Sequence, residues 1–182
     1  SLLVGTQFAK SLALALDKPL IAVHHMQAHV LANLIPDKKP SFPFLCLTVS
    51  GGHTQIVRCD SPTELVVIGE TVDDAAGEAF DKTAKLLGIE FPGGPQIEVY
   101  AKKGDPNKYD LPKPIFHKGG CNLSFAGLKT AVLKISKQIK TEQEKYDLAA
   151  SFQKTIEEIL YKKSKIAFEE FKKMNTVNKN KF

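Results

Sequence analysis

Cysteine, arginine and long apolar runs are all scarce in this 182-residue chain. The three cysteines are an odd number without Cys-x-x-Cys spacing, so they suggest neither a disulfide framework nor a thiolate zinc site. The apolar runs, of which residues 12–16 are an example, are far shorter than the ~20 residues of a membrane-spanning helix, and no secretory signal is visible. We therefore expect a protein of the reducing cytoplasm with no membrane partner.

Arg58 is the single arginine, so the net charge of +5 comes mainly from lysine. A basic balance favours polyanions as partners, but a solvated lysine-rich surface in a compositionally biased genome would give the same balance. Hydrophobic residues make up 43% of the chain, which is enough for one ordinary domain to bury a continuous core. The composition therefore indicates a globular protein and leaves its partner open.

Helical and strand patterns alternate along the chain, which is typical of an α/β protein whose sheet is covered by helices. Gly51 and Gly52 predict a turn, and residues 103–120 an irregular excursion. The first residue is serine and no strand pattern follows the last helical one, so we expect one truncated α/β unit over residues 1–182, incomplete at both ends. Periodicity predicts helices at 6–16, 25–34, 73–87, 96–102, after Gly127 and at 142–173, and strands at 20–23, 42–50, 53–58 and 64–70.

A pair of histidines, His25 and His29, is the sharpest local signal. Residues four apart on a helix share one face, where two imidazoles can bind one divalent metal ion. Met26 stands where a metallopeptidase of the His-Glu-x-x-His kind needs its general-base glutamate, so peptidase chemistry is disfavoured. His24 precedes the pair as a neighbour or a competitor. An isolated pair also arises by chance on helix surfaces, so its surroundings must support a metal site.

Thr48–Gly52 predicts a strand that ends in two glycines, where exposed backbone N–H groups can approach phosphate oxygens without interference from a Cβ atom. A plain hairpin turn explains the same residues. His53 and Thr54 favour a ligand site, because they place polar groups where the ligand would lie.

Carboxylates are concentrated in residues 73–81, at the start of a predicted helix. Capping and complementarity to the helix dipole explain most of them. Asp81 lies further into the helix, where a carboxylate can accept a sugar hydroxyl or a charged amine. Gly94, in a Pro-Gly-Gly-Pro turn, would let a ligand press against the backbone.

Six segments, taken in this order, resemble the tRNA threonylcarbamoyladenosine transferase family, called TsaD in bacteria and once described as an O-sialoglycoprotein endopeptidase. The similarity extends from residue 1 to about residue 168 and covers about half of a full-length member. The segments are Ser1–Gly5, His25–His29, Val49–Thr54, Gly69–Lys82, Pro92–Pro95 and Ser124–Thr130.

The resemblance implies an actin-like ATPase fold (ASKHA, ribonuclease H-like) of two lobes, of which this chain covers the end of the first and much of the second. It implies one divalent metal ion, iron with zinc as the alternative, held by His25 and His29 and by an aspartate near the family's C-terminus. No catalytic residue is implied. Matched position by position, the substrate-binding residues are Thr48, Val49, Ser50, Gly51, Gly52, Asp81 and Gly94.

The implied reaction moves a threonylcarbamoyl group from threonylcarbamoyl-adenylate to N6 of the adenosine beside the anticodon (adenosine 37) in tRNAs that read ANN codons, releasing AMP. The implied partners are tRNA, a paralogous dimer partner and a small ATPase of the same pathway. Two other functions stay open: a carbamoyltransferase acting on a small metabolite, and a catalytically dead partner of an active homologue.

The chain also departs from the family pattern. His24 replaces an asparagine and Gln27 replaces an acidic residue, which can alter the groups that orient a metal-bound imidazole. The family's opening Gly-Ile-Glu-Thr-Ser-like strand, its Gly-Gly-Val-Ala-Ala-Asn adenosine loop and its metal-binding aspartate have no counterpart here. We therefore expect the 182-residue chain to be inactive by itself.

Overall fold

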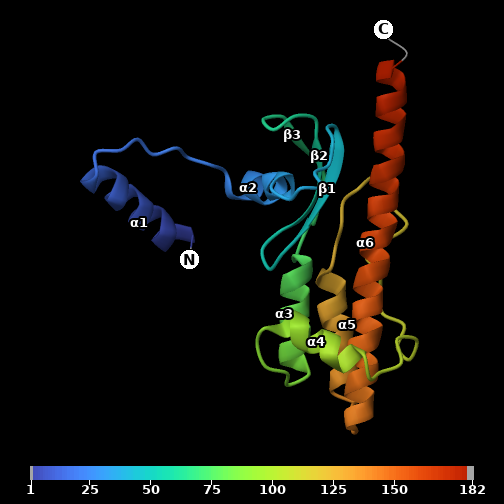
Figure 1. Cartoon of the computed structure of the whole chain (residues 1–182). Coiled ribbons are helices and arrows are strands. Elements are labelled where there is room, and N and C mark those ends of the chain that lie inside the picture. Colours follow the sequence, from blue (N-terminus) through green and yellow to red (C-terminus); the bar gives the residue numbers. More distant parts are fainter. Residues whose placement is uncertain (1, 180–182) are drawn as a thin grey trace. The chain divides into compact units, whose positions relative to one another are not determined.

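The computed structural model describes the backbone of residues 2–179 and the side chains of residues 2–174. The chain divides into two compact units, the first ending at Lys39 and the second beginning at Pro40, and each is described by itself. In the first unit, helix α1 spans Leu2–Ala15, helix α2 spans His25–Leu31 and a 3-10 turn, η1, spans Ala32–Leu34 (Figure 1). Both helices predicted for this region are thus confirmed, the first starting earlier than expected.

The strand predicted at residues 20–23 does not form, and this segment is irregular. Its apolar side chains are exposed, with Ile21 83% accessible. A strand is stabilised by hydrogen bonds to a neighbouring strand, and the described residues of this unit contain none. The prediction of a short buried strand is therefore wrong about both the pairing and the burial of this segment.

The second unit contains a three-stranded antiparallel sheet in the order β1-β2-β3. Strand β1 (Phe44–Val49) and strand β2 (Thr54–Cys59) form the predicted hairpin, and strand β3 (Leu65–Glu70) pairs with the other edge of β2. The predicted α/β class is confirmed in this coarse sense, as a mixed α/β unit with a small sheet.

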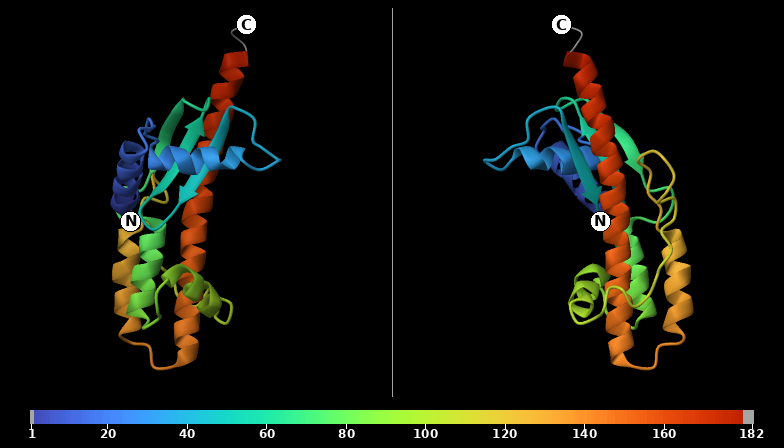
Figure 2. Two further views of the ribbon diagram at one scale, coloured as in Figure 1. Left: turned by 60° about the vertical axis from the view of Figure 1, so that its left-hand side comes forward. Right: turned by 90° about the vertical axis from the view of Figure 1, so that its right-hand side faces the viewer.

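Four helices accompany the sheet: α3 (Ala76–Leu86), α4 (Gly93–Ala101), α5 (Ala126–Ser136) and α6 (Glu142–Lys179). Helices α3 and α5 lie side by side below the sheet, and α6 runs past both and along β1 and β2 (Figure 2). All four correspond to helices that the periodicity predicts, although α3 begins later than residue 73. No helix among the described residues is long and apolar enough to cross a bilayer.

Helix α6 supplies much of the core. The predicted stripe is buried at Leu148, Phe152, Ile156 and Ile159, each at most 2% exposed, and Phe152 packs edge-on against Phe80 of α3. The apolar side chains of α6 are less buried in its C-terminal half, where Ile166 and Phe171 are half-buried. Burial of these side chains holds the helices together.

One buried residue of α6 is a lysine. The ammonium of Lys163 donates hydrogen bonds to the carbonyl oxygens of Lys118, at 2.8 Å, and of Gly120, at 3.3 Å. Burial lowers the pKa of Lys163, because it disfavours the charged form. These hydrogen bonds connect the segment before Cys121 to α6. The prediction that residues 103–120 are irregular is confirmed, and the end of this segment is held against α6.

The described cysteines form no disulfide. Cys59 and Cys121 are buried, and burial raises the pKa of each thiol to about 11. Both thiols therefore stay protonated at neutral pH.

Candidate functional site

The histidine pair lies on the first turns of α2. His24 occupies the position before the helix with an extended backbone (φ −67°, ψ 127°), and the helix begins at His25. The Nε2 atoms of His25 and His29 are 3.2 Å apart, their ring centroids are 4.4 Å apart, and both side chains are exposed. The prediction that the two imidazoles share an accessible face is confirmed.

The spacing of these two nitrogen atoms fits a shared metal ion. Two imidazoles bound at 2.0–2.1 Å to one tetrahedral zinc ion would place their nitrogens about 3.3 Å apart. Within residues 2–174 no group of three or more His, Cys, Asp or Glu side chains is arranged to hold a metal. The pair therefore provides two suitable donors and needs further ligands from elsewhere.

The glycine turn, residues 50–53, is fastened to the start of α3. The Ser50 N–H donates to the His53 carbonyl at 2.8 Å, and the His53 N–H donates to Ser50 Oγ at 3.0 Å. The Gly77 N–H of α3 donates to the Ser50 carbonyl at 3.1 Å. A Cβ atom on Gly77 would lie 2.7 Å from that carbonyl oxygen, so only glycine allows this approach.

Gly51 and Gly52 differ from Gly77, because none of the described residues crowds them. A Cβ atom on either would meet no atom within 4 Å, and neither has a left-handed backbone. Both are exposed, so their backbone is open to a ligand. Beside them, Thr48 is half-buried and donates its hydroxyl to the Gln55 carbonyl at 3.3 Å, whereas Val49 is exposed.

Thr54 does not face a ligand, contrary to expectation. Its side chain is fully buried, and its Oγ1 accepts a hydrogen bond from the Ala76 N–H at 2.9 Å. The hydroxyl therefore satisfies a donor at the start of α3, where backbone N–H groups have no partner within the helix. His53 remains exposed beside the turn.

Asp73 also has a structural role, but at a different helix from the one predicted. Its carboxylate accepts hydrogen bonds from the Ser124 hydroxyl and from the N–H groups of Phe125, at 2.7 Å, and Ala126, at 3.1 Å. It thus caps α5 rather than α3. The partners lie more than 50 residues away, so only the folded chain reveals this role.

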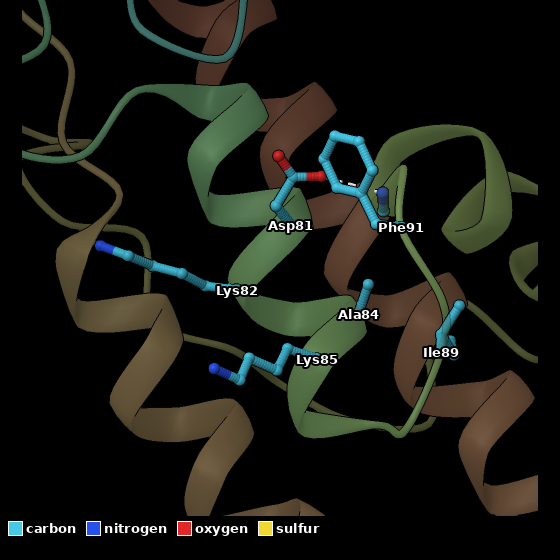
Figure 3. Close-up of a pocket in the computed structure, with 7 residues that line it drawn as sticks. Asp81, Lys82, Ala84, Lys85, Ile89 and Phe91 are labelled. Atoms are coloured by element: carbon cyan, nitrogen blue, oxygen red, sulfur yellow. Dashed lines mark hydrogen bonds between the residues drawn. The ribbon is translucent and has the colours of Figure 1, made fainter.

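Asp81 and the start of α4 meet beside a cleft of about 410 Å³ (Figure 3). Oδ1 of Asp81 accepts the Gly93 N–H at 2.8 Å, and a Cβ atom on Gly93 would lie 2.8 Å from the same oxygen. Gly94, the next residue, has no atom within 4 Å of its Cβ position. The cleft is lined by Asp81, Lys82, Ala84, Lys85, Ile89, Phe91 and Gly93.

The charges around this cleft are partly neutralised. The ammonium of Lys82 lies 2.7 Å from Asp74 and 2.9 Å from Glu78, and its hydrogen bond to Asp74, followed by that to Glu78, raises the pKa of Lys82. The side chains of Lys82 and Lys85 extend away from Phe91, whereas the Asp81 carboxylate lies beside it (Figure 3). Asp81 is therefore the charged group closest to the Phe91 side of the cleft.

The structure brings together, along α3, the predicted substrate-binding positions of the second unit. Gly77, which holds the glycine turn, and Asp81, which holds the start of α4, are four residues apart and share one face of that helix. The histidine pair belongs to the first unit. Its predicted proximity to Ser50–His53 stays a prediction.

These features define a mixed α/β protein with an open glycine turn, a cleft beside Asp81 and a pair of histidines suited to a metal. The family described as tRNA N6-adenosine threonylcarbamoyltransferase (TsaD) matches residues 1–181. The chain belongs to this family, which confirms the resemblance inferred from the motifs.

Relatives with this name match the chain closely. The protein of Pelagibacter ubique is 74% identical over 179 residues, covering 98% of this chain and 50% of the relative. Those of Ralstonia pickettii and Christiangramia forsetii are each 52% identical, covering 90% and 93% of this chain and 49% and 52% of the relatives. The chain spans about half the length of the curated relatives it matches.

Proposed function

We propose that this chain forms part of the site that transfers a threonylcarbamoyl group from threonylcarbamoyl-adenylate to N6 of the adenosine beside the tRNA anticodon. The observation that carries the proposal is the family match over residues 1–181, together with relatives named for this transfer. In the reaction, N6 attacks the carbamoyl carbon, the bond from that carbon to the phosphate oxygen breaks, AMP leaves with the electron pair and a proton leaves N6.

His25 and His29 are proposed to bind one divalent metal ion, iron or zinc, through their Nε2 atoms. The support is the 3.2 Å separation of these atoms and their exposure. Imidazole suits both metals, so the donor set does not choose between them. When bound, such an ion supplies a Lewis acid that can polarise a carbonyl oxygen or hold a carboxylate.

The glycine turn is proposed to bind the phosphate of the adenylate, and Asp81 to bind a ribose hydroxyl. The open backbone at Gly51 and Gly52 lets phosphate oxygens approach N–H groups closely. Oδ1 of Asp81 accepts a hydrogen bond from the Gly93 N–H, and Oδ2 would accept one from the ribose hydroxyl. Gly94 then allows the ligand to lie against the backbone.

The proposal also includes the two lobes of an actin-like ATPase fold, a paralogous dimer partner, a small ATPase and a cytoplasmic location. The mixed α/β architecture supports the fold, and the partners and the location are proposed from family membership alone. The assignment of residues 1–182 to the end of one lobe and much of the other is part of the same proposal.

Nucleotide binding by the isolated chain tests the proposed substrate site. The glycine turn, Asp81 and Gly94 supply one wall, so AMP should bind at least ~100-fold more weakly than to the full-length Pelagibacter ubique relative, because a half-closed site buries less of the ligand. Isothermal titration calorimetry on both proteins measures this difference.

Asp81→Asn should weaken the residual binding further, whereas Asp110→Asn, on an exposed loop, should not change it. Equal affinities of the chain and the full-length relative would show that these residues do not act as one wall of a larger site.

A further inference from the structure

Phe91 is an exposed aromatic residue at the edge of the cleft beside Asp81. The residue is 84% accessible and lies in the loop between α3 and α4. Figure 3 shows its ring standing next to the Asp81 carboxylate. Single exposed apolar residues are common on proteins, so the position of Phe91 matters more than its exposure.

Three features are arranged in order along the same side of α3. The glycine turn contacts Gly77, the carboxylate of Asp81 lies one helical turn further on, and the Phe91 ring stands beside Asp81. Side chains four residues apart on a helix are about 5–6 Å apart. That spacing matches the succession of phosphate, sugar and base in a nucleotide lying along the helix.

We propose that Phe91 is a stacking platform for an adenine ring bound in this cleft. The inference rests on the proposed function, since the substrates of that reaction carry adenine. The ring offers its face to the base, Asp81 accepts a sugar hydroxyl, and the glycine turn faces the phosphate. The volume of about 410 Å³ lies within the ~300–1,000 Å³ of small-ligand pockets.

Two sources can supply the adenine: the adenylate substrate and an unstacked adenosine of the RNA acceptor. Both would use the same face of Phe91, because every base has a π-face that stacks on an aromatic side chain. Stacking of one base on one aromatic residue changes affinity by about 5- to 100-fold.

The test compares AMP with ribose 5-phosphate, which lacks the base. NMR titration of the 182-residue chain, followed at the amides of Gly93 and Gly94, reports binding even when it is weak. Phe91→Ala should weaken AMP binding by about 5- to 100-fold and leave ribose 5-phosphate binding unchanged. Phe91→Trp should retain AMP binding.

The matched control is Phe168→Ala, which removes a 49% exposed phenylalanine from α6, outside the cleft, and should change neither ligand. Circular dichroism should show both alanine variants folded, because neither side chain is buried.

A second pair of ligands separates the two sources. An RNA stem-loop with one unpaired adenosine is compared with the same stem-loop lacking that base. If Phe91→Ala weakens the binding of AMP alone, the Phe91 ring stacks on the adenine of the adenylate. If it weakens the binding of the intact stem-loop alone, the ring stacks on the acceptor adenosine.

Unchanged binding of both AMP and the stem-loop by Phe91→Ala would overturn the proposal, as would equal losses for AMP and ribose 5-phosphate. These binding measurements involve no group transfer. They can therefore refute the stacking role of Phe91 without refuting the proposed reaction, and a failed transfer assay would not by itself refute the stacking role.

Discussion

Replacing His25 and His29 by alanine is expected to abolish threonylcarbamoyl transfer in a hybrid enzyme. The hybrid is the Pelagibacter ubique relative in which the matching half is replaced by this chain, at 74% identity. The two Nε2 atoms lie 3.2 Å apart and are the proposed metal donors, so removing both leaves the ion without its imidazole ligands. Modified adenosine in tRNA digests, measured by mass spectrometry, should fall below detection.

The matched control for this prediction is His24→Ala. His24 precedes α2, makes no capping hydrogen bond through its side chain and is exposed, so the control should stay active. Metal content gives a second readout, since the double variant should lose bound iron or zinc while its circular dichroism is unchanged. Transfer by the double variant at the unsubstituted rate would show that the pair has no part in the reaction.

Gly77→Ala is expected to damage both the fold and the substrate site. The new Cβ atom would lie 2.7–2.8 Å from three backbone atoms of Ser50 and Gly51, which cannot move aside as a flexible side chain could. Overpacking of this kind costs about 1–3 kcal/mol, and alanine returns up to about 1 kcal/mol through its helix propensity. We expect a net loss of about 1–2 kcal/mol in urea unfolding and displacement of the glycine turn.

Gly51→Ala, the matched control, makes the same chemical change in open space. Its Cβ atom meets nothing within 4 Å, so stability should change by less than about 0.5 kcal/mol. AMP binding should nevertheless fall, because the methyl group occupies the space proposed for phosphate. Gly77→Ala with unchanged stability and unchanged turn amides would contradict this packing, and Gly51→Ala with unchanged AMP affinity would contradict the phosphate site.

Local patterns were sufficient to predict most helices and strands of this chain. Helical spacing identified α2 and α6, and Gly51-Gly52 identified the hairpin, because both signals depend on residues close in sequence. The failure at residues 20–23 shows the limit, since strand formation depends on a partner that hydrophobicity does not reveal.

Roles that depend on distant partners could not be predicted. Thr54 caps a helix that starts 22 residues later, and Asp73 caps one that starts more than 50 residues later. Lys163 lies in a lysine-rich stretch that predicts a solvated surface. It is nevertheless buried against the carbonyl oxygens of Lys118 and Gly120, which are more than 40 residues earlier in the sequence. Phe91 gave no periodic signal either, and only its place beside Asp81 marks it.

The candidate site residues are predicted from the order of the motifs, and the structure adds how they are held. Asp81 binds the start of α4 while lying beside Gly94, and the glycine turn rests on Gly77 of the same helix. Helix α3 therefore positions both proposed substrate-binding elements of the second unit, which a pattern of separate motifs could not show.

Formation of modified adenosine by the hybrid enzyme tests the central claim most directly. The hybrid is incubated with unmodified tRNA, threonine, bicarbonate, ATP and the other proteins of the pathway, and the tRNA nucleosides are analysed by mass spectrometry. If residues 1–181 are a working half of a threonylcarbamoyltransferase, the hybrid should form N6-threonylcarbamoyladenosine at a rate comparable to that of the unaltered relative. A folded hybrid that binds metal and AMP but leaves the adenosine unmodified would contradict the account.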